Sequence, residues 1–189
     1  MKIGVLALQG AFIEHQKMLE GLQVNTIEVR LPEHLNTIDG LIIPGGESTT
    51  IGKLAEAYNL IAPIQAFAKK RPIWGTCAGM IFMARQIDHT NQQLLKIMDI
   101  RVQRNAFGRQ VDSFLESLDI PALNGASFPG VFIRAPAVVN SGPDVQIVSC
   151  LSDGQVVAVK EKNLLATSFH PELTDDHRFH QFFLDMVDT

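Results

Sequence analysis

The chain places Cys77 at the centre of a Gly-Thr-Cys-Ala-Gly segment, Gly75–Gly79. A short apolar run precedes this segment, and a stretch with helical character, Met80–Arg85, follows it. A strand, a tight turn and a helix form a nucleophile elbow, here with cysteine as the nucleophile. Flanking glycines leave room for a strained turn, and a helix N-terminus favours the thiolate over the thiol. The alternative interpretation is a buried cysteine with incidental glycines beside it.

A histidine and a carboxylate that suit such a nucleophile occur much later, in the segment Ser168–Glu172. Pro171 fixes its own φ and favours extended backbone just before it. Residues two apart in extended backbone project to the same side, so His170 and Glu172 are expected to meet. The carboxylate would hold one ring nitrogen and leave the other for the thiol of Cys77. On its own, the segment would more simply be a His-Pro turn followed by a solvated glutamate.

A second glycine-rich turn, Pro44–Ser48, follows an apolar run and precedes a predicted helix. Ligands of open α/β sheets bind beyond the carboxyl ends of the strands, so this turn is expected beside the elbow. The backbone N–H groups of Gly46 and Ala78 are candidates for holding a developing oxyanion. Phosphate binding is the alternative use of such a turn, but the Gly-x-x-x-x-Gly-Lys spacing of a P-loop is missing.

Alternating short apolar runs and helical periodicities predict a doubly wound α/β fold, with a mostly parallel sheet flanked by helices. In the C-terminal half, β-rich runs separated by turn signals predict antiparallel hairpins. Residues 101–126 allow no assignment, and the whole chain, 1–189, is expected to be one domain. Strands are predicted over 2–8, 24–29, 39–43, 73–74, 145–150, 155–159 and 164–169, and helices over 12–22, 48–58, 63–70, 80–85 and 175–187.

Composition narrows the classes of partner and compartment. The 189 residues carry a net charge of −4, so no basic excess is available for nucleic acid. The two cysteines form no disulfide framework, and a reactive thiol suits a reducing compartment. The apolar N-terminal run is too short for a signal peptide or a membrane span and is expected to be a strand. We therefore expect a cytoplasmic protein that binds neither nucleic acid nor membranes.

The strings Pro-Gly-Gly-Glu-Ser, Gly-Thr-Cys-Ala-Gly and His-Pro-Glu, in this order, resemble those of class I (triad) glutamine amidotransferases. Three further strings resemble the glutaminase subunit of pyridoxal 5′-phosphate synthase, and together the six span nearly the whole chain. These three are Leu6-Ala7-Leu8-Gln9-Gly10, Arg104-Asn105-Ala106-Phe107-Gly108-Arg109-Gln110 and Phe132-Ile133-Arg134-Ala135-Pro136.

The resemblance implies that Cys77, His170 and Glu172 form a catalytic triad for hydrolysis of L-glutamine, with no cofactor and no metal. It also implies that the partner is a separate synthase subunit. We expect this partner to switch activity on through Gln9 or the Gly45-Gly46 turn. The residues implied to contact glutamine are Gly46, Glu47, Ser48, Arg104, Ile133 and Arg134.

Three alternatives stay open at this point: a glutaminase that feeds another acceptor, a cysteine peptidase, and a non-catalytic ligand-binding module on the same fold. Composition and spacing do not decide whether Arg104 or Arg134 pairs with the carboxylate of glutamine. Among the remaining residues, His177 and His180 are expected on a solvated helix face, and Cys150 in the core.

Overall fold

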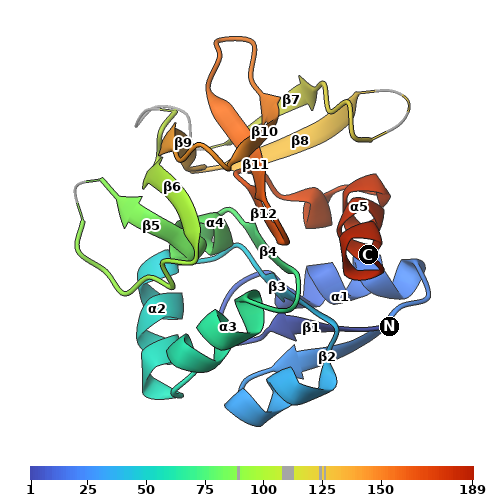
Figure 1. The fold of residues 1–189 in the computed structure, drawn as a ribbon. Coiled ribbons are helices and arrows are strands. Elements are labelled where there is room, and N and C mark those ends of the chain that lie inside the picture. The colour runs from blue at the N-terminus through green and yellow to red at the C-terminus, as the bar shows by residue number, and fades with distance from the viewer. Residues whose placement is uncertain (89, 108–112, 124, 126) are drawn as a thin grey trace.

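The computed structural model describes residues 1–88, 90–107, 113–123, 125 and 127–189. Within these residues one ten-stranded sheet runs through both halves of the chain, in the order β2-β1-β3-β4-β12-β11-β9-β6-β5, with β10 paired to β11 (Figure 1). The first five strands of this order are β2 (Asn25–Val29), β1 (Lys2–Leu6), β3 (Gly40–Ile43), β4 (Ile73–Thr76) and β12 (Leu164–Thr167).

These five strands are mutually parallel. Strands β3 and β4 are buried along their whole length, as expected for strands covered on both faces. The chain passes from β1 to β2 on one side and then returns to β3 on the other. This reversal creates the switch point at which open α/β sheets form their sites.

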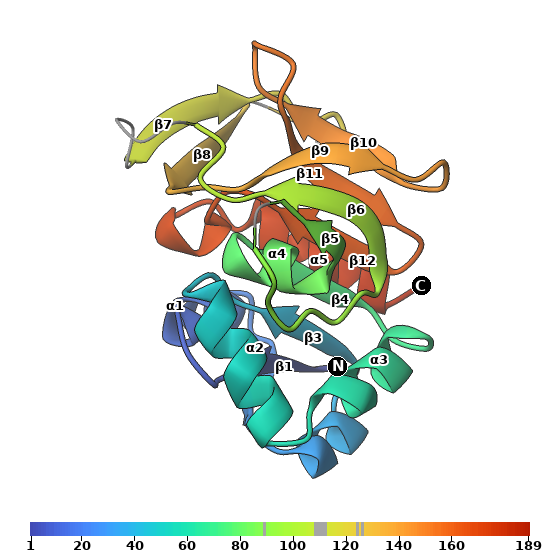
Figure 2. The ribbon, with the colours of Figure 1, turned by 90° about the vertical axis from the view of Figure 1, so that its left-hand side faces the viewer.

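Helices cover both faces of the parallel strands, which confirms the doubly wound fold (Figures 1 and 2). One face packs against α1 (Phe12–Gly21) and α5 (Arg178–Val187) around the buried ring of Trp74. The other face packs against α2 (Ser48–Ala57), α3 (Ile61–Ala68) and α4 (Ala78–Met83). A 3-10 helix, η1 (Pro32–Thr37), connects β2 to β3.

The C-terminal half contains the expected antiparallel pairings. The remaining strands of the large sheet are β6 (Met98–Gln103), β9 (Ala137–Ser141), β10 (Gln146–Cys150), β11 (Val156–Glu161) and, before them in the chain, β5 (Ala84–Ile87), which pairs parallel with β6. Strand β11 pairs antiparallel with β12, β9 and β10. A separate antiparallel hairpin, β7 (Ser113–Leu118) and β8 (Phe128–Ile133), lies at the same end of the molecule as β9 and β10 (Figures 1 and 2).

Three local expectations are corrected by the structure. The elbow helix ends at Met83, because Ala84 turns to extended backbone and begins β5. His180 is fully buried instead of solvated, and Cys150 is exposed instead of buried. Residues 108–110 of the longest family string lie outside the described residues. In the part of the chain that is described, no helix combines the length and apolar character needed to cross a membrane.

Candidate active site

The loops that follow β1, β3, β4 and β12 meet at one edge of the sheet and line a cleft of about 410 Å³. Because these strands are parallel neighbours, their carboxyl ends lie together. The cleft is the place where the sequence predicts a reactive thiol and its partners. Its lining includes Gln9, Gly45, Gly46, Glu47, Ser48, Cys77, Ala78, Arg104, Ile133, Arg134 and His170.

Cys77 occupies a strained turn between β4 and α4. Its φ and ψ are 49° and −103°, a conformation that L-residues rarely adopt. The turn is held by the Cys77 N–H, which donates to the Thr167 carbonyl at 2.7 Å. A Cβ on Gly79 would overlap the Ile43 carbonyl, which explains the glycine two residues after the cysteine. The structure therefore has the geometry of a nucleophile elbow at Cys77.

His170 contacts both Glu172 and Cys77. The Nδ1 of His170 lies 2.6 Å from Glu172 Oε1, and the Glu172 side chain is fully buried. The local backbone differs from the expected extended segment, because Pro171 begins a 3-10 helix, η2 (Pro171–Leu173). Proline is well tolerated in this first position. The backbone N–H of His170 donates to the Val131 carbonyl at 2.8 Å. Strand β8 therefore helps to fix the backbone from which the imidazole projects.

The charges around His170 favour its protonated form. Burial alone would lower the pKa of this histidine, but the opposing effects of its partners are larger in sum. Hydrogen bonds to Cys77 and Glu172, together with the negative charges of both, raise the pKa to about 10. A protonated imidazole between a sulfur and a carboxylate is an acid placed to donate a proton to a leaving group.

Gly45 and Gly46 pass close over the histidine and the loop after β1. A Cβ on Gly45 would overlap the His170 ring, and one on Gly46 would overlap the amide oxygen of Gln9. Two hydrogen bonds hold this turn: the Ala11 N–H donates to the Gly45 carbonyl at 3.0 Å, and the Glu47 N–H donates to Gln9 Oε1 at 2.7 Å. Residues 9–11 thus control the position of the turn.

Glu47 caps helix α2 and pairs with Arg104. Its carboxylate accepts from the N–H groups of Thr49 at 3.1 Å and Thr50 at 2.7 Å, and Arg104 Nη2 lies 3.3 Å from Oε1. Burial is the largest single effect and raises the pKa of this carboxyl group, but the hydrogen bonds from Thr50 and Thr49 together outweigh it and lower the pKa to about 2. Glu47 therefore links the start of α2 to the guanidinium at the rim of the cleft.

Replacing Glu47 with alanine is expected to lower the free energy of unfolding by about 1 kcal/mol, because the helix loses its N-cap. The capping carboxylate has a depressed pKa, so its contribution is present above the ordinary value of 4.5 and is lost as the pH falls toward about 2. Urea unfolding at several pH values measures both effects. Glu56→Ala, at an exposed position of the same helix, is the control and should change stability by less than about 0.5 kcal/mol. An equal stability of Glu47→Ala and wild type at pH 7 would contradict the capping role.

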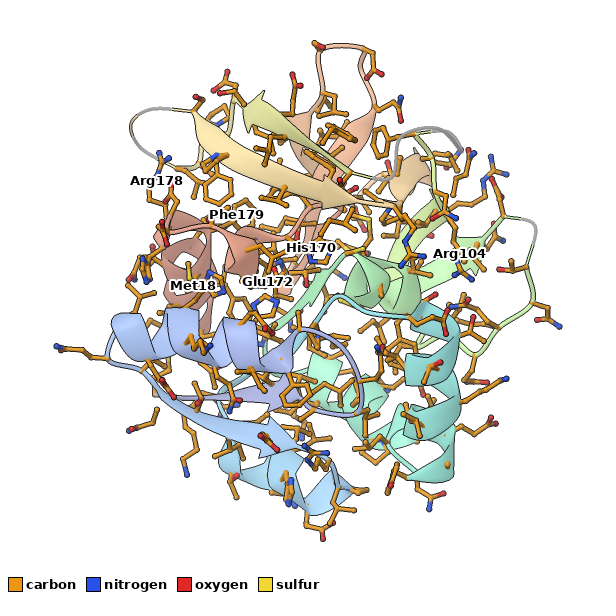
Figure 3. All side chains as sticks on the ribbon, turned by 180° about the vertical axis from the view of Figure 1, so that it is seen from behind. Met18, Arg104, His170, Glu172, Arg178 and Phe179 are labelled. Atoms are coloured by element: carbon orange, nitrogen blue, oxygen red, sulfur yellow. The ribbon has the colours of Figure 1, made fainter. Side chains whose placement is uncertain are left out.

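All of the residues proposed from the sequence for catalysis and glutamine contact lie in or directly below this cleft. Ser48 is buried, and its hydroxyl donates to Gln92 Oε1 at 3.3 Å. Arg134 follows β8 with a φ of 42°, and the Ile133 carbonyl is 3.9 Å from the Cys77 sulfur. Figure 3 shows Arg104 and His170 approaching the site from different elements.

Sequence reasoning missed three polar residues that lie beneath the site: His15, Thr76 and His180, each fully buried. His15 is 3.0 Å from His180 and 3.2 Å from the Thr76 hydroxyl. A signal for the burial of the two histidines was available, because His15 falls on the apolar face of α1 and His180 lies between phenylalanines of α5.

Among the described residues, no group of three or more His, Cys, Asp or Glu side chains is arranged to hold a metal ion.

Comparison with known proteins adds independent information. A family model described as the SNO glutamine amidotransferase family matches residues 5–189. A curated relative from Dehalococcoides mccartyi, named pyridoxal 5′-phosphate synthase subunit PdxT, is 57% identical over 192 residues, covering 100% of this chain and 98% of the relative. A relative of the same name from Herpetosiphon aurantiacus is 56% identical over 190 residues, covering 98% of this chain and 100% of the relative.

Two solved structures have the same fold. One, described as a glutamine amidotransferase, has a TM-score of 0.94 at 45% sequence identity and covers 99% of both chains. The other is described as a putative GMP synthase subunit from Thermoplasma acidophilum. It has a TM-score of 0.71 at 18% identity and covers 100% of this chain and 94% of that one. At that identity the second likeness concerns the fold alone.

Proposed function

The chain belongs to the SNO glutamine amidotransferase family, and from this premise we propose that it hydrolyses L-glutamine to L-glutamate and ammonia as the glutaminase subunit of a pyridoxal 5′-phosphate synthase. The name shared by its curated relatives supports the assignment to this synthase. The single observation that supports the chemistry best is the buried contact of His170 with Glu172, since the same imidazole also interacts with the elbow cysteine.

We assign the first half of the reaction to Cys77 and His170. The Cys77 thiolate attacks the side-chain amide carbon of glutamine, and the carbonyl oxygen becomes an oxyanion. His170, as imidazolium, then gives its proton to the amide nitrogen, the C–N bond breaks, and ammonia leaves. The product on the enzyme is a γ-glutamyl thioester. The raised pKa of His170 supports this acid role.

The second half of the reaction regenerates the Cys77 thiolate and the protonated form of His170. Neutral His170 removes a proton from water as the oxygen attacks the thioester carbon, and the C–S bond breaks to release glutamate. We assign oxyanion stabilisation in both halves to the backbone N–H groups of Gly46 and Ala78. Ala78 is the first residue of α4, where a helix leaves its N–H groups without partners inside the helix.

Recognition of glutamine is assigned to the rim of the cleft. The α-carboxylate of glutamine pairs strongly with a guanidinium, and both Arg104 and Arg134 line the cleft. The Glu47 carboxylate already accepts hydrogen bonds from the start of α2, so we assign the α-ammonium to carbonyl groups of residues 133–134. Glu47, Gly46 and Ser48 shape the opposite wall.

Ammonia is useful only to an acceptor enzyme, so the proposed partner is a synthase subunit. The proposed compartment is the cytoplasm, where thiols stay reduced.

We expect the synthase subunit to increase glutamate release by this chain several-fold. The Gly45-Gly46 turn carries an oxyanion N–H, and its position depends on contacts with Gln9 and Ala11. A partner that moves these residues would therefore control the rate. Glutamate release is measured for the purified chain with and without the synthase, after co-purification of the two. Equal rates would contradict control by the partner, and no glutamate in either case would contradict the glutaminase function.

A further inference from the structure

A chain of buried polar side chains continues from the proposed triad into the protein. Glu172 Oε2, the carboxylate oxygen that faces away from His170, lies 3.5 Å from His15 Nε2, and both side chains are fully buried. His15 Nδ1 in turn lies 3.0 Å from His180 Nε2. Figure 3 shows Glu172 between His170 and helix α1, the helix that carries His15. Helices α1 and α5 therefore each contribute one imidazole below the carboxylate.

Burial keeps both of these imidazoles neutral. Burial is the main reason that the pKa of His15 lies well below its ordinary value, and the neighbouring His180 and His170 lower it further. Burial, followed by the charge of His177, lowers the pKa of His180 to about 3. Each ring consequently carries one N–H and one lone pair, and the direction of the hydrogen bond between them depends on which nitrogens are protonated.

Only one arrangement of protons satisfies the surroundings. If His15 were protonated at Nδ1, His180 would have to accept at Nε2 and carry its proton at Nδ1. That atom is buried and has no hydrogen-bond partner among the described residues, and orphaned buried N–H groups are rare. The lone pair of His15 Nε2 would also face the negative charge of Glu172. Protonation of both rings at Nε2 removes both problems.

In that arrangement His180 Nε2–H donates to His15 Nδ1. The Nε2–H of His15 points between Glu172 Oε2 and the Thr76 hydroxyl, whose oxygen is 3.2 Å from His15 Nε2. The Trp74 ring packs edge-on against both imidazoles, with ring centroids 5.4 Å from His15 and 4.9 Å from His180. The imidazoles are thus fixed in place by packing as well as by hydrogen bonds. Glu172 Oε2 is buried and has no hydrogen-bond partner among the described residues, and His15 Nε2, at 3.5 Å, faces it.

We propose that His15 is a positioning residue of the active site, whose Nε2–H is directed at Glu172 Oε2 and holds the carboxylate against His170, with His180 setting the tautomer of His15. The inference rests on the proposed roles of Cys77, His170 and Glu172. A neutral donor suits this position, because it orients the carboxylate without competing with His170 for its charge. Groups that orient metal-ligating residues through one hydrogen bond commonly affect activity by about 10- to 100-fold, and we expect an effect of similar size for the carboxylate of Glu172.

Kinetics of the full chain with its synthase subunit provide the first test. His15→Leu removes the donor at similar volume, and we expect kcat for glutamate release to fall roughly tenfold while KM for glutamine stays unchanged. His15→Gln places an amide donor close to the position of Nε2 and should recover most of the loss. His34→Leu, at a half-buried imidazole of η1 that does not line the cleft, is the control and should match wild type. A wild-type kcat in His15→Leu, or folded His15→Gln as slow as His15→Leu, would overturn the proposal.

Nitrogen NMR of the wild-type chain with ¹⁵N-labelled histidine tests the tautomer directly, even if His15→Leu does not fold. The signals missing in His15→Gln identify His15. A proton on Nε2 supports the inference, and a proton on Nδ1 overturns it.

Failure of the proposed function is recognised separately. If the proposed function fails, wild type releases no more glutamate than Cys77→Ala. If this inference alone fails, wild type is active and His15→Leu is equally fast.

Discussion

Replacing Cys77 with alanine is expected to reduce glutamate release to background, a loss of at least about 10⁴-fold. Without the sulfur no thioester can form, and the buried cleft offers water no comparable activation. The substitution removes one partly enclosed atom, and alanine can adopt the same turn at a similar cost. The melting temperature should therefore stay within a few degrees of wild type. Steady-state glutamate release in the presence of the synthase subunit measures the effect.

Cys150→Ala is the matched control, because Cys150 is a free cysteine on the exposed side of β10. It should retain the wild-type rate. The complex that contains Cys77→Ala should still form pyridoxal 5′-phosphate from added ammonium salt, since only the supply of ammonia is lost. A glutamine analogue that alkylates thiols should label Cys77 and leave Cys150 unmodified. Glutamate release by Cys77→Ala at the wild-type rate would show that another residue is the nucleophile.

The same labelling experiment separates the enzyme from a non-catalytic binding module on this fold. A binding module would need neither the strained φ of 49° at Cys77 nor a buried carboxylate against His170. Backbone strain and buried charge both cost stability, so their presence together indicates chemistry at this cleft. Absence of labelling at Cys77, even with the synthase present, would favour the binding module.

The parallel strands and the elbow could be predicted from the sequence because their signals are local. Strands such as β3 and β4 are short runs that are buried on both faces, and glycine-rich turns such as Pro44–Ser48 mark where strands end. The end of helix α4 could not be predicted. Its residues are buried on all sides, so no polar face marks where the helix stops and β5 begins.

The strands of the C-terminal half were harder to predict, for a related reason. Strand β7 alternates exposed and partly buried residues, so its apolar pattern is weak, and β8 is its one partner among the described strands. Partners such as β6 and β9 are far apart in the sequence, and their registers contain irregularities. Alternation alone cannot specify such pairings.

The site itself was predictable as a set of residues but not in its local geometry. His170 and Glu172 meet, as expected, yet they do so through a 3-10 turn that begins at Pro171 instead of through extended backbone. Proline is compatible with both conformations, so the residue types could not choose between them. His15 and His180 become neighbours only when α1 and α5 pack on the same face of the sheet, which no spacing in the sequence reveals.

Replacing Glu172 with glutamine is expected to lower kcat roughly 10²- to 10⁴-fold, because His170 loses the anion that orients it and stabilises its proton. The carboxylate is one of the groups that raise the pKa of His170 to about 10, so removing its charge lowers that pKa. Because the acid form of His170 is required for ammonia to leave, the alkaline limb of kcat/KM should move from near pH 10 to lower pH.

The pH profile distinguishes this role from a structural one, since loss of packing would lower the rate without moving the limb. The variant preserves the shape of a fully buried side chain, and its folding is checked by the melting temperature. Glu20→Gln, at an exposed position of α1, removes one negative charge elsewhere and should leave both the rate and the profile unchanged. A Glu172→Gln enzyme with the wild-type alkaline limb would mean that the carboxylate does not control the proton of His170, and the triad would reduce to Cys77 and His170 alone.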